Sequence, residues 1–210
     1  MASNPKLHVV VGTGPLGMAV MRTLVARGET VRMVNRSGKA KVPAGVSVVA
    51  ADVYNLDRAR EACRGAEVVY QCAKPPYHEW PQKFPPLQAN ILEAAASAGA
   101  RLVIGENLYM YGEVPNRPIT EDLPYLATTL KGRIRAQMAE AALAAHRSGK
   151  VQVAIGRASD FFGPGVLEST IGARAPSCAS RQNRFTDREH RPAAYLYFHR
   201  RFRKSVGDTW

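Results

Sequence analysis

The 210-residue chain has few cysteines, no long apolar run and a shortage of acidic residues. Its three cysteines, Cys63, Cys72 and Cys178, are odd in number and widely spaced, which argues against a disulfide framework and against a zinc site. No apolar run approaches the roughly 20 residues that a membrane helix needs, and the first residues lack the regions of a signal peptide. We therefore expect a protein of the reducing cytoplasm with no bound metal and no membrane partner.

The shortage of acidic residues is concentrated at one end of the chain. There are 29 Lys and Arg against 17 Asp and Glu, a net charge of +12. Residues 173–210 hold nine of the basic and three of the acidic residues, so this stretch carries half of the excess. The excess is not spread along the chain, as it would be in a uniformly basic nucleic-acid-binding protein. The pattern indicates a mildly basic domain with an unusual basic tail, and it does not favour nucleic acid as a partner.

Short apolar runs alternate with helical patterns through most of the chain. The runs predict six strands, at residues 7–11, 30–34, 46–50, 67–72, 101–105 and 151–155. The helical patterns lie at residues 15–27, 56–64, 87–98 and 132–147. This alternation predicts an α/β domain over residues 5–165, with a doubly wound parallel sheet and helices on both faces.

The first predicted strand runs directly into a glycine-rich turn, GTGPLG, which fits the pattern G-x-G-x-x-G. In a dinucleotide site Gly12 permits the tight turn, Gly14 lets the backbone approach a pyrophosphate, and Gly17 lets the helix pack closely on the strand. Pro15 stands at the helix start, where its missing N–H costs little. Because strand, turn and helix follow in this order, we favour a Rossmann-like NAD(P) site over an ordinary glycine turn.

The second predicted strand leads to Asn35, in the region where NAD-binding folds usually carry an acidic residue for the ribose 2′-hydroxyl. A neutral residue does not repel a 2′-phosphate, and Arg36 can bind one with two hydrogen bonds, assisted by Ser37 and Lys39. The alternative is that Arg36 and Lys39 are solvated loop charges. The pattern favours NADP(H) over NAD(H).

Two further positions follow predicted strands. Asp52 is either a partner of the adenine amino group or the N-cap of the next helix. Ala73 lies either beside the cofactor's far ribose or at a plain strand exit. The cofactor-binding candidates on these grounds are Gly12, Thr13, Gly14, Pro15, Leu16, Gly17, Asn35, Arg36, Asp52, Val53 and Ala73.

These features resemble the short-chain dehydrogenase/reductase superfamily, in its extended or atypical branch of NAD-dependent epimerase/dehydratase-like proteins. The matching segments are Gly12–Gly17, Asp52-Val53, Tyr109–Gly112 and Arg157–Gly165, in the family's order over about residues 6–170. The resemblance implies a small hydroxy or carbonyl substrate, with nucleotide sugars included. It further implies a Tyr of a Y-x-x-x-K pair that moves a proton while the nicotinamide exchanges a hydride. The Ala-rich helices are compatible with a homodimer.

The sequence departs from this family at its catalytic positions. Asn107 occupies the Ser/Thr position, where its amide can still hydrogen-bond a carbonyl, and Ala127 stands where the tyrosine is expected, four residues before Lys131. Lys131 is a candidate both for catalysis and for holding the nicotinamide ribose. The alternative is that Lys131, Arg133 and Arg135 form one solvated basic helix face.

Two phenols remain near the expected site. Tyr111 is the better acid/base candidate and Tyr125 the weaker one, and for both the alternative is a packing role. The leading hypothesis is an NAD(P)-dependent oxidoreductase or epimerase. The alternative hypothesis is a non-catalytic NADP(H)-binding sensor, which the absence of the family tyrosine favours.

Residues 166–210 are expected to form only an incomplete substrate lobe with an arginine-rich tail. From Ala173 onward there are eight arginines but a single Leu, a single Val, and no Ile or Met. The tail has three alternative interpretations. It is a basic arm that contacts phosphates through residues 200–204, or a solvated extension without a role, or the product of a reading-frame change after about Gly172. The abrupt loss of apolar residues favours the last of these.

Overall fold

The computed structural model describes residues 6–159 and residue 161. The chain divides into two compact units, of which the first comprises Met1–Gly105 and Tyr109–Ile155 and the second comprises Glu106–Leu108 and Gly156–Trp210. The expectations for residues 166–210, the incomplete lobe and the basic tail, lie outside the described residues.

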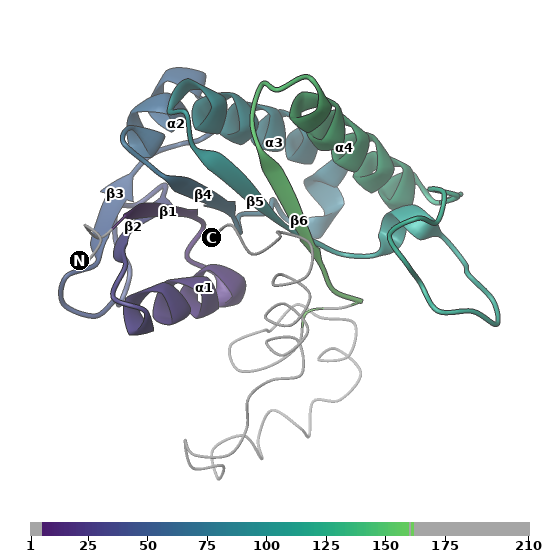
Figure 1. Cartoon of the computed structure of the whole chain (residues 1–210), viewed down its shortest axis with the longest axis horizontal. Helices are drawn as coiled ribbons and strands as arrows, with labels where there is room; N and C mark the ends of the chain where they lie inside the picture. The colour runs from purple at the N-terminus through teal and green to yellow at the C-terminus, as the bar shows by residue number, and fades with distance from the viewer. Residues whose placement is uncertain (1–5, 160, 162–210) are drawn as a thin grey trace, which may run out of the picture. The chain divides into compact units, whose positions relative to one another are not determined.

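A six-stranded sheet is the centre of the fold (Figure 1). Its strands are β1 (Leu7–Val11), β2 (Thr30–Asn35), β3 (Ser47–Ala50), β4 (Val68–Gln71), β5 (Arg101–Glu106) and β6 (Val153–Arg157). Their order across the sheet is β3-β2-β1-β4-β5-β6, and β1 pairs in parallel with both β2 and β4. The winding therefore reverses beside β1, which makes its carboxyl end the topological switch point where open α/β sheets bind ligands.

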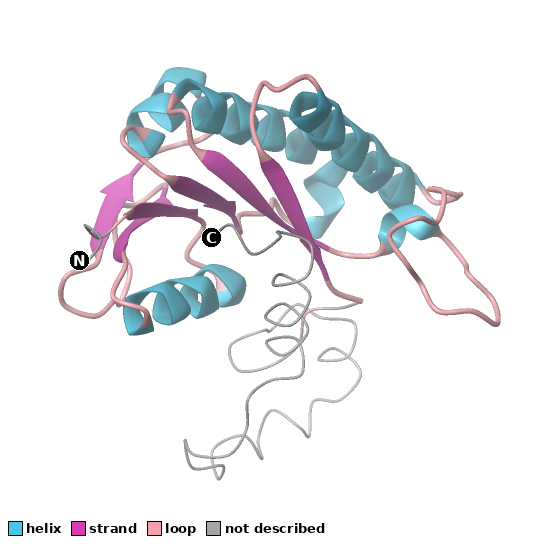
Figure 2. Cartoon of the chain, viewed as in Figure 1, coloured by secondary structure: helices cyan, strands magenta, loops and turns pink. Residues whose placement is uncertain are grey.

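Helices cover both faces of this sheet (Figure 2). Helix α1 (Pro15–Ala26) lies on one face, and α2 (Leu56–Cys63), α3 (Trp80–Ser97) and α4 (Leu130–Arg147) lie on the other. Two 3-10 helices, η1 (Tyr77–Glu79) and η2 (Tyr109–Tyr111), follow β4 and β5. The predicted α/β fold with a doubly wound parallel sheet is confirmed.

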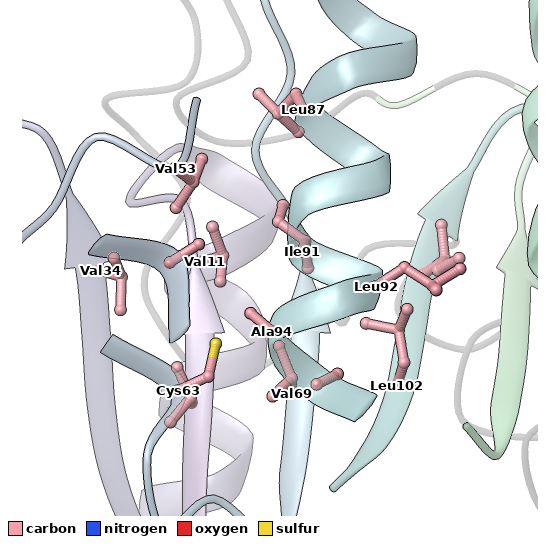
Figure 3. Close-up of a cluster of buried hydrophobic side chains, with 14 of the residues drawn as sticks. Val11, Val34, Val53, Cys63, Val69, Leu87, Ile91, Leu92, Ala94 and Leu102 are labelled. Carbon is pink, nitrogen blue, oxygen red and sulfur yellow. The ribbon is translucent and has the colours of Figure 1, made fainter. Parts of the chain in front are cut away.

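Alternating side chains of the strands supply two separate cores. Val11 of β1 faces α3, where it lies near Ile91 (Figure 3). Val9 and Leu102 belong to the same larger cluster. Val10 faces the opposite way and joins a smaller cluster that includes Met21 and Leu24 of α1 together with Val31 and Met33 of β2. Because both faces of the central strands are buried, they read in the sequence as unbroken apolar runs.

Helix α3 begins earlier than the sequence analysis predicts, at Trp80 rather than at about residue 87. Pro85 and Pro86 lie inside it, and proline inside a helix removes a backbone hydrogen bond. Burial of two aromatic rings offsets this cost: the Trp80 and Phe84 ring centroids are 5.0 Å apart, and the indole N–H donates to the carbonyl of Pro75 at 3.2 Å. Tertiary packing thus overrides the local signal that the prolines give.

Candidate functional site

The turn from β1 into α1 has the shape that its glycines permit. Gly12 has φ +110°, and its N–H donates to the carbonyl of Val34 at 2.9 Å, which ties the turn to β2. A Cβ on Gly12 would lie 2.7 Å from the Ala73 nitrogen, and a Cβ on Gly17 would overlap the Gly12 carbonyl oxygen. Both positions are therefore closed to any larger residue.

Gly14 differs from these two glycines because the space around it is open. It is the N-cap residue of α1, it has no side-chain capping hydrogen bond, and a Cβ built on it would meet no atom within 4 Å. Pro15 follows in the first turn, and both residues are exposed. Leu16 points to β5, where its Cδ2 lies 2.6 Å from a Cβ placed on Gly105. The first turn of α1 thus presents backbone N–H groups to an open space, a cradle that fits a pyrophosphate.

Asn35, the last residue of β2, connects this turn to the loop that follows it. The Asn35 Nδ2 donates to Thr13 Oγ1 at 3.0 Å and to the carbonyl of Lys39 at 2.9 Å. The Gly38 N–H donates to Asn35 Oδ1 at 2.7 Å. Arg36, the candidate for a 2′-phosphate, is exposed next to this network. The structure therefore brings Thr13, Asn35 and the Arg36 loop together at the carboxyl edge of the sheet.

The structure of the segment after β3 excludes one of the two roles considered for Asp52. The N-cap of α2 is Asn55, whose Oδ1 accepts from the N–H of Arg58 at 3.1 Å, so the N-cap role considered for Asp52 is wrong. Asp52 is exposed, and its Oδ1 accepts from the N–H of Tyr54 at 3.1 Å. Its carboxylate has room for a second partner, because a carboxylate offers about four acceptor sites.

Sequence reasoning missed Asn90 of α3, which fastens this segment. Its Nδ2 donates to the carbonyl of Val53 at 3.0 Å and to that of Tyr54 at 2.8 Å. The Val53 side chain is buried in the larger core cluster. A polar residue within an Ala-rich helix was the available signal, but its partners lie more than thirty residues away in the sequence.

The residues after β4 pack directly behind the glycine turn. Ala73 abuts Gly12 through its backbone, and the Cys72 Cβ lies 3.5 Å from a Cβ placed on Gly17. Burial raises the pKa of the Cys72 thiol to about 12, so at neutral pH it stays protonated. Cys72 is therefore a packing residue here, since the thiolate is the reactive form.

The start of α4 places Lys131 beside an aromatic ring that sequence reasoning did not single out. The Lys131 Nζ lies 3.2 Å from the ring centroid of Tyr77 in η1, and Tyr77 is 49% exposed. Thr129 caps α4 by accepting from the N–H of Gly132 at 3.1 Å. A Cβ placed on Gly132 would clash with the Cβ of Ala127, the residue that stands where the family tyrosine is expected. Lys131 is thus half-buried next to a phenol from another segment.

Tyr111 and Arg135 are both buried in the first unit. Tyr111 is 1% exposed, and its ring packs edge-on against Tyr125 with centroids 5.5 Å apart. Arg135 is 2% exposed, and its guanidinium carbon lies 4.8 Å from the ring centroid of Phe84. The alternative of one solvated basic face that includes Arg135 is therefore wrong, although Arg133 is exposed.

Asn107 belongs to the second unit, which includes Glu106–Leu108, and it is buried. In this unit the Arg157 Nε donates to Glu106 Oε2 at 2.9 Å, and the N–H of Ala158 donates to the Glu106 carbonyl at 3.0 Å. The start of the family-like segment Arg157–Gly165 is thereby fixed to the end of β5.

Within residues 6–159 and 161, no group of three or more His, Cys, Asp and Glu side chains is arranged to hold a metal ion. No helix in this part of the chain is both long and apolar enough to cross a membrane.

Several solved structures of known proteins have a fold similar to that of this chain. The dTDP-glucose 4,6-dehydratase of Streptomyces venezuelae, solved with NAD bound, matches with a TM-score of 0.71 at 19% identity, over 83% of this chain and 62% of its own. The UDP-glucose 4-epimerase of Thermus thermophilus, in complex with NAD, matches with a TM-score of 0.67 at 19% identity, over 81% of this chain and 60% of its own.

A short-chain dehydrogenase/reductase superfamily protein from Agrobacterium tumefaciens with bound NAD gives a TM-score of 0.67 at 22% identity, over 84% of this chain and 58% of its own. The chain therefore spans less than two thirds of the length of these three structures, and at such identities the likeness shows the fold. Curated protein sequences give no match. The model of the NAD dependent epimerase/dehydratase family matches residues 9–184, and the chain belongs to that family.

Proposed function

We propose that the chain binds NADP(H) at the carboxyl edge of its sheet. The observation that carries this proposal is the turn from β1 into α1, where Gly12 and Gly17 are sterically required and the surroundings of Gly14 are open. The pyrophosphate would lie on the first turn of α1. Arg36 would bind the 2′-phosphate, and Asp52 would accept a hydrogen bond from the adenine amino group.

We infer that the activity is that of an oxidoreductase or epimerase on a small hydroxy or carbonyl compound. Nucleotide sugars are the first class to test, because similar structures are named as acting on dTDP-glucose or UDP-glucose. When bound, the coenzyme supplies hydride exchange at its nicotinamide. Lys131 would hold the ribose and Tyr111 would move the proton. The role of Asn107 as a hydrogen-bond donor to the substrate carbonyl stays a separate prediction.

One observation favours a second candidate, a sensor that binds NADP(H) without turning over a substrate. Ala127 stands where the family tyrosine is expected, and a Cβ placed on Gly132 would clash with the Ala127 Cβ. Tyr111, the remaining candidate for the proton transfer, is 1% exposed and packed on Tyr125. A sensor of this kind would have no phenol in its site that exchanges protons with a substrate.

Titration and turnover assays on the full chain separate these possibilities. NADPH and NADH are first titrated by fluorescence, and we expect NADPH to bind more tightly. Absorbance at the reduced-nicotinamide band is then followed with dTDP-glucose, UDP-glucose and simple carbonyl compounds, and the sugar products are separated by chromatography, because an epimerase returns the hydride and leaves the coenzyme unchanged. Net hydride transfer or conversion of a sugar supports the enzyme, whereas tight binding without either supports the sensor. Binding of neither dinucleotide would reject both.

The homodimer and the cytoplasmic location expected from the sequence stay predictions. The dimer is best tested by light scattering of the full chain. A monomer at all concentrations would reject it.

A further inference from the structure

The side chain of Asn35 has all of its polar atoms engaged by the protein. A primary amide offers two N–H donors and one acceptor oxygen with two lone pairs. The two Nδ2 bonds go to Thr13 Oγ1 at 3.0 Å and to the Lys39 carbonyl at 2.9 Å. The Oδ1 accepts from the Gly38 N–H at 2.7 Å and from Ser37 Oγ at 3.3 Å. Nothing in this arrangement leaves the amide free for a ribose.

These bonds close the loop 36–39 against the sheet. Gly38 has φ +66°, and a Cβ on it would lie 2.9 Å from the Ala50 Cβ of β3, so the loop packs tightly on its neighbour strand. Arg36 lies inside this closed loop and is exposed. The direction in which Arg36 leaves the backbone is therefore set by the bonds that Asn35 makes.

We propose that Asn35 is a positioning residue for coenzyme selection, which fastens the Arg36 loop to the glycine turn through Thr13. This inference rests on the proposed binding of NADP(H). Thr13 lies in the turn that would hold the pyrophosphate, and Arg36 in the loop that would hold the 2′-phosphate. Through Asn35 the two phosphate sites are held as one rigid unit, which lowers the entropy lost on binding a ligand that uses both.

The same geometry predicts an unusual response to an acidic residue. In dinucleotide-binding folds an acidic side chain in this region binds the ribose 2′-hydroxyl, so Asn35→Asp would ordinarily favour NADH. Here an Asp side chain would lose both N–H donors and would place an oxygen against the Lys39 carbonyl, which cannot donate. The substitution opens the loop, and we expect weaker NADPH binding with no gain for NADH.

The test uses the full chain and titrations of NADPH, NADH and adenosine 2′,5′-bisphosphate. Asn35→Ala and Asn35→Asp are each expected to weaken binding of NADPH and of the bisphosphate about tenfold, the loss that one or two hydrogen bonds would give. NADH binding should change less than about threefold. Arg36→Gln is the matched control, which should weaken NADPH binding by removing the charge while the loop stays closed.

Hydrogen exchange provides a readout that does not depend on any ligand. The Gly38 amide should exchange faster in Asn35→Ala than in wild type, and at the wild-type rate in Arg36→Gln. Thr13→Val removes the acceptor of one Nδ2 bond, so the loss of NADPH binding that it causes should be smaller in an Asn35→Ala background than in wild type, and an equal loss in both backgrounds would contradict the coupling. Thermal melts of each variant show that the fold is retained, and Thr13→Val preserves the test if Asn35→Ala does not fold.

The outcomes distinguish this inference from the proposed function. A wild-type chain that binds neither dinucleotide overturns both. Tight NADPH binding by the wild type, matched by Asn35→Ala with unchanged Gly38 exchange, overturns the inference alone. A gain of tenfold or more in NADH affinity for Asn35→Asp would also overturn it, because the side chain would then face the ribose directly.

Discussion

The glycine turn and the start of α4 belong to the same unit, yet they follow the family pattern to different degrees. At the turn each glycine of the motif is present, and the surrounding backbone explains why Gly12 and Gly17 must be glycine. At the start of α4, Ala127 replaces the tyrosine, and Lys131 lies over the ring of Tyr77 instead. The proposed binding of the coenzyme at the glycine turn and the proposed catalysis at the start of α4 therefore have to be tested separately.

The largest effect is expected for Gly12→Ala. A methyl group would lie 2.7 Å from the Ala73 nitrogen, and the backbone has φ +110°, so the turn has to move. We expect a loss of about 1–3 kcal/mol in the free energy of unfolding and loss of measurable NADPH binding. Urea denaturation and fluorescence titration measure the two effects.

Gly14→Ala is the matched control for that substitution. Gly14 has φ −72° and an open environment, so alanine fits the folded chain. We expect stability within about 0.5 kcal/mol of wild type, but NADPH binding at least about tenfold weaker, because the methyl group fills space needed by the ligand. Unchanged NADPH binding would mean that the ligand does not approach this turn.

The next largest effect is expected for Lys131→Met, at the start of α4. If the chain is an enzyme, turnover should fall about 100-fold or more, whereas NADPH binding should weaken less than about tenfold because the phosphate contacts remain. Arg133→Gln, an exposed position on the same helix, should leave both unchanged. Equal losses of turnover and of NADPH binding would mean that Lys131 acts through coenzyme binding, and the glycine turn and the start of α4 would then not have separate roles.

A smaller effect is expected from Tyr77→Leu, which removes the ring under Lys131. The cation–π contact is partly exposed, so its loss should lower the free energy of unfolding by about 0.5–1 kcal/mol. Tyr77→Phe keeps the ring and should match wild type in urea denaturation. In a Lys131→Met background Tyr77→Leu should cost less, and an equal cost in both backgrounds would contradict the pairing.

The last effect is one of pH and concerns His8, at the opposite end of β1 from the glycine turn. Its Nδ1 lies 3.1 Å from the Tyr70 hydroxyl and its Nε2 lies 3.5 Å from a Glu29 carboxylate oxygen. Burial, the largest influence, lowers the pKa of His8; Arg27 lowers it further, whereas Glu29 and Glu67 raise it.

The direction of the pH effect follows from this lowered pKa. The unfolded chain takes up a proton at His8 before the folded chain does, so the free energy of unfolding falls as the pH drops below about 6.5. Between pH 7.5 and 5.5 we expect a loss of less than about 1.4 kcal/mol in urea denaturation. The variant His8→Gln should lose less over the same range, and an equal loss would assign the pH dependence to other groups.

Local features of the site could be predicted from the sequence because they depend on residues close together in the chain. The glycine turn, the proline at the start of α1 and the alternation of strands and helices are set by backbone sterics and by the period of apolar residues. The positions of the strands agree with the structure to within about two residues. The start of helix α3 was predicted wrongly, because the aromatic rings that offset the cost of its two prolines stabilise the helix only when the tertiary structure packs them together.

Side-chain partners, in contrast, were decided by the tertiary structure. The sequence placed Asn35 and Arg36 after the second strand, but only the fold shows that the Asn35 amide turns toward Thr13, twenty-two residues earlier. The same holds for Arg135, which charge alone marks as a surface residue, and which the fold buries over Phe84. Composition and periodicity fix which elements form, whereas the partner of a polar side chain depends on which distant segments the sheet brings to one edge.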